Sequence, residues 1–233
     1  FKPGRHPYHH AGVFYSQEPS ASSAAPLLGV RPGMRVLDMC AAPGGKSSQL
    51  AAALQGRGVL VSNEYVAARA DILKSNLERM GVSNAVVLNE SPARIADALP
   101  EFFDRVLVDA PCTGTGTLRR NPDLKWRLTP QELDRINAVQ KSVLEEAAKL
   151  LKPDGRLVYA TCSVLQRENQ DVVKTFLESH PEFELLNATD VLAKQGVTLP
   201  DFQKEEFGDF FVMLPHRHHT DGFFAAVLHK KKA

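Results

Sequence analysis

The chain has 233 residues, which is enough to bury a sizeable core, and we expect a single α/β domain. Its 28 Lys and Arg residues nearly balance its 27 Asp and Glu residues, so composition excludes a globally basic nucleic-acid binder and any basic surface must be local. Three cysteines without paired spacing argue against a disulfide scaffold and favour a cytoplasmic setting, and no stretch is long and apolar enough to cross a membrane.

The first part of the chain has no regular period. Residues 1–19 mix aromatics, histidines and prolines, and we expect an irregular segment that packs over the core. The three histidines of this segment have no acidic or cysteine partner at ligand spacing, so no metal site is expected. Residues 20–29 carry small and apolar side chains and predict a short helix before the core. Because the chain opens on Phe1 rather than Met, we expect it to be a fragment of a longer protein.

Residues 35–46, RVLDMCAAPGGK, combine a short apolar run with a Pro-Gly-Gly corner. Val36 and Leu37 suit a buried parallel strand that Asp38 closes, and the two glycines allow a tight turn and the close approach of a ligand. A helix is predicted from Ser47 to Leu54. Open α/β sheets bind nucleotides at such a turn after the first strand, so the segment predicts a nucleotide-sized pocket. The absence of GxGxxG spacing disfavours a nicotinamide enzyme.

A second strand is predicted at residues 58–64 and ends in the carboxylate of Glu64. Glu64 lies about 20 residues after Gly45, which is the spacing of the acidic ribose ligand in dinucleotide sites. The alternative is a solvated carboxylate at a strand end. A helix is predicted over residues 66–80 and ends before Gly81. Its predicted buried face consists of Ala67, Ala70, Leu73, Leu77 and Met80.

The rest of the chain alternates strand and helix patterns. Further strands are predicted at residues 85–88, 103–109, 156–161, 184–186 and 222–229. Further helices are predicted at residues 131–151 and 168–177. Residues 187–221 have the composition of a loop. Such alternation predicts a doubly wound, mostly parallel, Rossmann-like sheet with helices on both faces.

Two later strands end in cysteine-containing segments, Asp109-Ala-Pro-Cys112 and Ala160-Thr-Cys162. The carboxyl ends of parallel strands share one edge, so both segments should face the same cleft as the glycine turn. A cysteine at a strand end in a cleft is suited to nucleophilic work. Cys40 is interpreted instead as packing beneath the turn.

Residues 110–130 form a long connection, and ordered loops of this length are uncommon unless they are functional. The loop places basic side chains around the only tryptophan, which predicts phosphate contacts and base stacking of the kind that single-strand binders use. The alternative is a basic solvated loop with its tryptophan tucked inward. The residues concerned are Arg119, Arg120, Lys125, Trp126 and Arg127.

Three segments together resemble a known family. VLDMCAAPGGK, LVDAPCTGTG and LVYATCSVLQRENQ are similar to the sequential signatures of the Sun-type (NOL/NOP/Sun) RNA cytosine-5 methyltransferases, which use S-adenosylmethionine. The resemblance covers residues 12–185 and the final strand, and HPYHHAGVFYSQEPSA and SNEYVAARA most resemble the bacterial ribosomal-RNA branch. It implies a class I methyltransferase domain at residues 31–233 after a lead-in at 1–30. Ribosomal RNA is the implied partner, with an RNA-binding domain missing from this sequence.

The resemblance also implies roles for individual residues. Cys162 is the implied nucleophile that adds to cytosine C6, and Cys112 assists release of the methylated RNA. Asp109 would hydrogen-bond the N3 edge of the base, and Lys46 would hold the geometry of the site. The residues implied to contact S-adenosylmethionine are Cys40, Ala41, Ala42, Pro43, Gly44, Gly45, Lys46, Glu64, Arg69, Asp109 and Pro111.

The implied adenine contact departs from the family pattern. Family members often place an aspartate after the third strand, where this chain has Asn89-Glu90-Ser91, so Asn89 or Glu90 is expected to substitute.

Three rival functions remain open. A DNA cytosine-5 methyltransferase carries its nucleophile in the Pro-Cys segment, so the Thr-Cys segment favours RNA. Transfer RNA is the alternative RNA substrate. A noncatalytic RNA-binding assembly factor on the same fold is the third reading, and loss of Cys112 or Cys162 would have supported it, but both are present.

Overall fold

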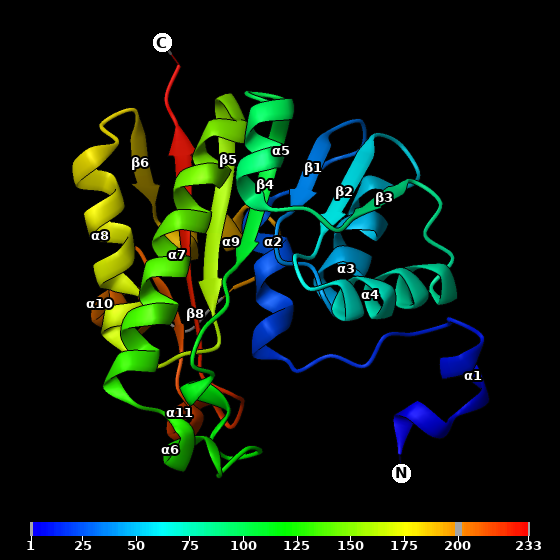
Figure 1. The fold of residues 1–233 in the computed structure, drawn as a ribbon, viewed down its shortest axis with the longest axis horizontal. Helices are drawn as coiled ribbons and strands as arrows, with labels where there is room; N and C mark the ends of the chain where they lie inside the picture. The colour runs from blue at the N-terminus through cyan, green and yellow to red at the C-terminus, as the bar shows by residue number, and fades with distance from the viewer. Residues whose placement is uncertain (1, 199–201, 233) are drawn as a thin grey trace.

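A single sheet organises the computed structural model, which describes residues 2–198 and 202–232 (Figure 1). Its strand order is β3-β2-β1-β4-β5-β8-β6, and β7 pairs with β8 outside this path. Strands β1 to β5 are parallel to one another, whereas β8 runs antiparallel to β5, and β6 and β7 run antiparallel to β8. The predicted doubly wound, mostly parallel sheet is therefore confirmed. The strands are β1 (Arg35–Asp38), β2 (Val59–Asn63), β3 (Ala85–Leu88), β4 (Phe103–Asp109), β5 (Leu151–Thr161), β6 (Phe183–Leu186), β7 (Phe211–Met213) and β8 (Phe223–Lys230).

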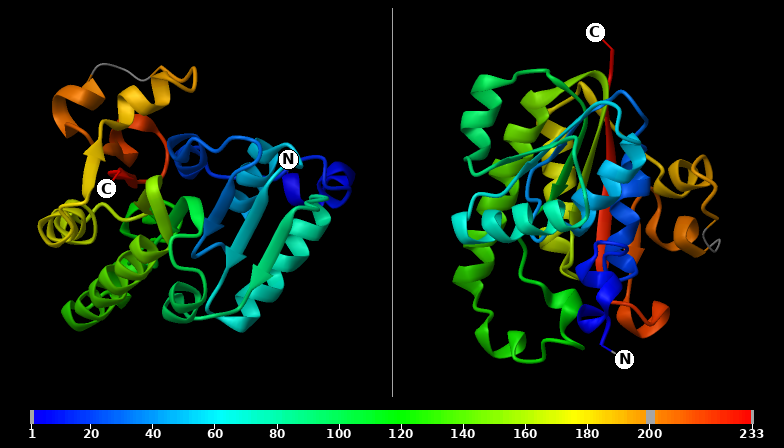
Figure 2. Two further views of the ribbon diagram at one scale, coloured as in Figure 1. Left: turned by 90° about the horizontal axis from the view of Figure 1, so that it is seen from above. Right: turned by 90° about the vertical axis from the view of Figure 1, so that its right-hand side faces the viewer.

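Helices cover both faces of the sheet, as the edge-on view at the right of Figure 2 shows. One face carries α2 (Ala24–Leu28), α3 (Gly45–Leu54) and α9 (Ala188–Ala193). The other carries α5 (Pro92–Ala98), α7 (Pro130–Leu150) and α8 (Gln170–Ser179). Helix α4 (Ala67–Arg79) packs beside β3 and the turn after β1. Among the described helices, none has the length and apolarity that crossing a membrane requires.

The strands supply two cores because successive side chains point to opposite faces. Val36 and Leu107 belong to the core beneath α2 and α3, whereas Leu37 and Val106 belong to the core beneath α5 and α7. All four side chains are fully buried. Burying a side chain of this size contributes about 1.5 to 3 kcal/mol. With both faces covered, the carboxyl ends of the parallel strands are where polar side chains can meet a ligand.

Two predictions about secondary structure were wrong. Helix α5 was not expected, although Pro92 at its first turn and the Ser91 cap, whose Oγ accepts from the backbone N of Arg94 at 3.3 Å, are ordinary start signals. Residues 187–221 are not a loop. They contain α9, α10 (Phe202–Phe207), β7 and α11 (Pro215–His218), while 199–201 lie outside the described residues. Strand β7 forms by pairing with β8. A strand this short depends on its partner, so the local sequence does not predict it.

Smaller differences concern element boundaries. Strand β5 begins at Leu151 rather than at Arg156, and helix α3 begins at Gly45 rather than at Ser47. On α4 the middle of the predicted apolar face is buried, but Ala67 is exposed. The long connection after β4 also contains two short helical pieces, a 3-10 turn at Thr115–Thr117 and α6 (Leu124–Arg127).

The N-terminal segment contacts the C-terminal end of α4 at Arg79 before it reaches the sheet (Figure 1). It contains α1 (Pro7–His10), and the guanidinium of Arg79 on α4 donates to the backbone O of His9 at 2.7 Å. Further along, a Cβ atom on Gly45 would lie 2.9 Å from Cε1 of Tyr15. The segment thus contacts the glycine turn directly and forms part of the wall of the cleft.

Candidate active site

Three adjoining cavities follow the carboxyl ends of the parallel strands. The first, of about 420 Å³, contains Cys112 and Cys162 in its lining and is called the cysteine cavity here. The second, of about 590 Å³, is lined by Glu64 and is called the Glu64 cavity. The third, of about 310 Å³, lies against the glycine turn and shares Lys46 with the cysteine cavity. Cys40 lines all three cavities, so they meet at the turn after β1.

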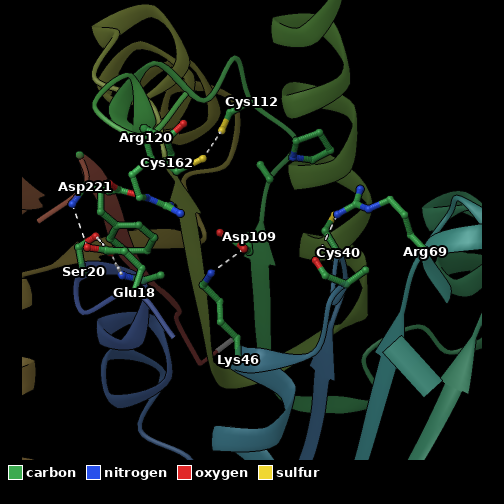
Figure 3. Close-up of a pocket in the computed structure, with 17 residues that line it drawn as sticks. Glu18, Ser20, Cys40, Lys46, Arg69, Asp109, Cys112, Arg120, Cys162 and Asp221 are labelled. Carbon is green, nitrogen blue, oxygen red and sulfur yellow. Dashed lines mark hydrogen bonds and ion pairs between the residues drawn. The ribbon is translucent and has the colours of Figure 1, made fainter. Parts of the chain in front are cut away.

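The two cysteines of the strand-end segments lie in contact. The Sγ atoms of Cys112 and Cys162 are 3.3 Å apart, and both thiols are free (Figure 3). The hydrogen bond from Cys112 lowers the pKa of the Cys162 thiol, against burial. The same hydrogen bond, together with burial, raises the pKa of the Cys112 thiol. Of the two thiols, Cys162 is therefore the one that loses its proton more readily.

Lys46 and Asp109 form the floor of the cysteine cavity. Lys46 extends from the first turn of α3, and its Nζ lies 2.7 Å from Oδ2 of Asp109 at the end of β4. Burial disfavours the Lys46 charge, but the Asp109 carboxylate outweighs burial and raises the Lys46 pKa. The turn before α3 depends on Gly44, whose φ of 112° only glycine adopts readily.

A second ion pair forms one wall of the cavity, opposite Arg69 (Figure 3). Nε of Arg120 donates to Oδ2 of Asp221 at 2.8 Å, and the Asp221 side chain is only 3% exposed. The backbone N of Asp221 donates to Oε1 of Glu18 at 2.9 Å. Within this described network, Asp221 Oδ1 is buried and has no hydrogen-bond partner.

Sequence reasoning missed Glu18 and Asp221. The bond between Asp221 and Glu18 spans 203 positions in the chain, so no local pattern reports it. One signal existed: Asp221 directly precedes β8, and because β8 is antiparallel to its neighbour, its start lies at the carboxyl edge of the parallel strands.

Gly116 locks three segments of the site together. Its backbone N donates to the carbonyl of Cys162, and its own carbonyl accepts from the backbone N of Gly222, both at 2.8 Å. A Cβ atom at Gly116 would lie 2.4 Å from the carbonyl oxygen of Gly222. The long connection must therefore carry glycine here to reach the cysteine segment and the start of β8.

Glu64 is buried rather than solvated, so the alternative of a solvated strand-end carboxylate is wrong. Its residue is 4% exposed, and Oε1 accepts from the backbone N of Val66 at 3.0 Å. Oε2 accepts no hydrogen bond and lies 3.4 Å from Nη1 of Arg69. Arg69 also donates from Nη2 to the carbonyl of Ala42 at 3.2 Å, which ties α4 to the glycine turn. The remaining walls are mainly apolar and include Val66, Pro92, Ala93, Pro111, Val139 and Val143.

The segment after β3 offers Ser91 to the Glu64 cavity. Asn89 turns away, since its Nδ2 donates to the carbonyls of Glu64 and Tyr65 at 2.7 and 2.9 Å. The Glu90 carboxylate pairs with Arg94 at 2.9 Å. Neither Asn89 nor Glu90 lines the cavity, whereas Ser91 does.

The basic loop is only partly gathered at the cleft. Trp126 is 80% exposed, so the alternative with an inward tryptophan is wrong. Nζ of Lys125 lies 4.9 Å from the Trp126 ring centroid. Arg127 pairs with Asp123 at 2.6 Å, and Arg119 is exposed. Of the four predicted basic residues, Arg120 alone lines the cysteine cavity.

The other predicted residues lie in the turn and at the cleft. Ala42, Asp109 and Pro111 line the cysteine cavity, and Ala41, Pro43 and Gly45 line the third cavity. Gly44 packs instead against Leu73 of α4, where an added Cβ would lie 3.2 Å from Cδ1. Cys40 packs against the core and also lines all three cavities.

Fold and site together define a doubly wound α/β protein with a nucleotide-sized cleft and a thiol pair at its strand ends. The family model described as 16S rRNA methyltransferase RsmB/F matches residues 25–229. The chain belongs to this family. The Sun-type resemblance read from the sequence is thereby confirmed.

Relatives and solved structures agree with this membership. The chain is 38% identical over 229 residues to ribosomal RNA small subunit methyltransferase F of Erwinia tasmaniensis and 41% identical to the protein of that name from Vibrio atlanticus. Each comparison covers 95% of this chain and 46% of the relative, so the chain spans about half the length of the curated relatives it matches. NSun6 from Pyrococcus horikoshii, solved with SFG, superposes with a TM-score of 0.86 at 27% identity over 100% of this chain and 57% of that one. A methyltransferase homologue from the same organism gives 0.80 at 32% identity over 99% and 72%.

Proposed function

We propose that this chain carries the catalytic part of an S-adenosylmethionine-dependent enzyme that forms 5-methylcytosine in small-subunit ribosomal RNA. The observation that carries the proposal is the contact between Cys112 and Cys162, whose Sγ atoms lie 3.3 Å apart beside a nucleotide-sized cavity. Two thiols in one cleft suit a reaction in which a covalent bond to the base is made and then broken. The choice of substrate is supported by the relatives, which are small-subunit ribosomal RNA methyltransferases.

The Glu64 cavity fits S-adenosylmethionine. Glu64 Oε2 is buried and lacks a hydrogen-bond donor, which suits the ribose hydroxyls, and the apolar walls suit an adenine ring. The relative solved with SFG, an S-adenosylmethionine analogue, supports this choice. In this proposal the cofactor supplies an electrophilic methyl group on a positively charged sulfur. Arg69, Cys40 and Pro111 line both large cavities, so the methyl donor and the base would meet along them.

The cysteine cavity supplies the activation of the base. Cytosine C5 is a poor nucleophile, so the Cys162 thiolate first adds to C6; the new S–C6 bond moves the ring electron pair towards C5 and N3. The Lys46–Asp109 pair can provide the hydrogen bond and the proton that N3 then requires. C5 becomes enamine-like and able to accept the methyl group.

Release reverses the addition. The C5 proton leaves to a base, the C5–C6 double bond forms again, the S–C6 electron pair returns to Cys162, and N3 gives its proton back to the Lys46–Asp109 pair. Cys112 lies in contact with that sulfur and can donate a hydrogen bond to the departing thiolate. Cytoplasmic action is part of the proposal, because free thiols require a reducing compartment.

Mass mapping of 5-methylcytosine tests the proposal. Small-subunit ribosomal RNA from cells that lack the gene should lose a methylated cytosine, and the wild-type gene should restore it whereas Cys162→Ala should not. Loss of a methylated cytosine in transfer RNA alone would identify transfer RNA as the substrate. An unchanged methylation map in both RNAs would overturn the proposal in favour of a noncatalytic role.

A further inference from the structure

Glu168 is a buried acid that joins the two cysteine segments. Its residue is 0% exposed. Oε1 accepts from the backbone N of Thr113 at 2.8 Å, and Oε2 accepts from Oγ1 of Thr113 at 2.6 Å and from Oγ of Ser163. Thr113 follows Cys112 in the chain and Ser163 follows Cys162, so one carboxylate fixes the residue after each thiol.

Further contacts make this junction rigid. Nε2 of Gln140 on α7 donates to Oε1 of Glu168 at 2.9 Å, and the hydroxyl of Tyr159 donates to the Glu168 carbonyl at 2.7 Å. Asn169 donates from Nδ2 to the carbonyl of Ser163 at 2.9 Å. Both carboxylate oxygens therefore accept hydrogen bonds from donors on several elements. These bonds fix the residues that follow the two cysteines.

Burying an acidic side chain in this position costs folding free energy compared with burying an apolar one. In the described part of the chain, every hydrogen-bond partner of the Glu168 carboxylate is neutral. A buried carboxylate without a cation gives less stability than well-packed apolar side chains of similar volume. What the carboxylate offers here is geometry: two acceptor oxygens on one side chain reach donors on both cysteine segments.

The hydrogen bond between the two thiols is the largest cause of the difference between their pKa values: it lowers the pKa of Cys162 and raises that of Cys112. A carboxylate lies near each thiol. Asp109 raises the pKa of Cys162 more than Lys46 lowers it, and Glu168 raises the pKa of Cys112 after the hydrogen bond and burial. The titratable and charged groups that face the pair from the surrounding elements are Lys46, Asp109, Arg120, Tyr159 and Glu168.

We propose that Glu168 is a positioning residue for the thiol pair: its hydrogen bonds to Thr113 and Ser163, the residues that follow the two cysteines, hold Cys112 against Cys162. The catalytic meaning rests on the proposed function, whereas the thiol contact itself does not. Two adjacent thiols are chemically alike, and the hydrogen bond in this contact makes them unlike. Cys162 is left as the nucleophile, and Cys112 is left protonated for the release step.

Alkylation measured separately at each cysteine tests this without RNA or cofactor. The folded protein is treated with iodoacetamide across a pH series, and peptide mass spectrometry gives the midpoint for each thiol. In the wild type, Cys162 should react at lower pH than Cys112. Glu168→Gln keeps the size of the side chain but replaces one acceptor oxygen with an amide nitrogen that only donates, so it loses part of the tether to Thr113 and Ser163. The thiol contact should loosen, and the Cys112 and Cys162 midpoints should approach each other by about one unit.

Thr113→Val is the matched variant, because it keeps the charge but loses the hydroxyl donor to Oε2. It should loosen the thiol contact and raise the Cys162 midpoint, since the hydrogen bond from Cys112 is what lowers it. Circular dichroism establishes that each variant is folded, and Thr113→Val tests the tether even where Glu168→Gln does not fold. Unchanged midpoints at both thiols in folded variants would overturn the inference. Shifted midpoints in a protein that makes no 5-methylcytosine would overturn only the proposed function.

Discussion

The cysteine cavity and the Glu64 cavity lie side by side but differ in the polarity of their walls. In the cysteine cavity most charges are paired within the protein: Lys46 with Asp109, and Arg120 with Asp221. In the Glu64 cavity the walls are mainly apolar, and Glu64 lies 3.4 Å from Arg69 while its Oε2 accepts no hydrogen bond. Preorganised pairs suit a place where charge develops during a reaction, whereas an unsatisfied acceptor suits a place that waits for a ligand.

The largest expected effect separates chemistry from binding. Cys162→Ala should lower methyl transfer by at least about 1000-fold, because loss of a nucleophile removes the covalent route. Affinity for S-adenosylmethionine should stay the same, since Cys162 lines the cysteine cavity and not the Glu64 cavity. Radiolabelled methyl transfer and calorimetry give the two values. Methylation near the wild-type rate would remove Cys162 from its assigned role.

Cys112→Ala should separate the two steps of the reaction in the cysteine cavity, covalent addition and release. The variant should still form the bond between Cys162 and C6 but release the methylated RNA slowly, because the sulfur that assists the departing thiolate is gone. A denaturant-resistant protein–RNA band should appear on a gel and should require S-adenosylmethionine. The double variant that also lacks Cys162 should show no band. If Cys162→Ala were the variant that trapped RNA, the roles of the two cysteines would be reversed.

Glu64→Ala tests the other cavity. Losing hydrogen bonds to a charged group costs about 1.5 to 3 kcal/mol, so affinity for S-adenosylmethionine should fall about tenfold or more. Glu90→Ala is the matched control, since this carboxylate pairs with Arg94 and does not line the cavity. Calorimetry that gave equal losses for the two variants would remove the distinction between them.

The stability of the protein should depend on pH through Asp38, a buried residue at the end of β1 that lines the third cavity. Burial raises the pKa of Asp38 to about 7, although Oδ2 accepts from Oγ of Ser47 at 2.7 Å. Because the folded pKa lies above the unfolded one, the contribution of Asp38 to stability is fully present below the unfolded pKa, about 4, and is lost as pH rises towards 7. Asp38→Asn removes this titration. Urea unfolding across that pH range should show a flatter profile than the wild type, and parallel profiles would contradict the shift.

The smallest expected effect concerns the approach of RNA to the cysteine cavity. Arg119 is exposed and directly precedes Arg120, which lines the cysteine cavity, so Arg119→Gln should lower the slope of log affinity against log salt by about 0.7. Arg127 is already paired with Asp123, and Arg127→Gln should change the slope less. Equal slopes in wild type and Arg119→Gln would place the RNA surface elsewhere.

Local sequence determined the frame of this protein. Apolar runs ending in Asp38, Asp109 and Thr161 predicted parallel strands, and their carboxyl ends do meet at one edge. The glycine turn and the two strand-end cysteines were therefore predictable as neighbours, because strand direction alone brings such ends together.

Tertiary structure decided what surrounds that frame. The sequence predicted that Asn89 or Glu90 would line the Glu64 cavity. In the structure Ser91 lines it, whereas the Asn89 side chain donates hydrogen bonds to the carbonyls of Glu64 and Tyr65. The wall formed by Asp221 and Glu18 depends on the direction of β8. Because β8 is antiparallel to β5, its first residues lie at the same edge of the sheet as the last residues of the parallel strands. Strand β7 depends on pairing with β8 in the same way. Such contacts join residues far apart in the chain, and their free energy comes from packing and pairing that no local pattern of polarity records.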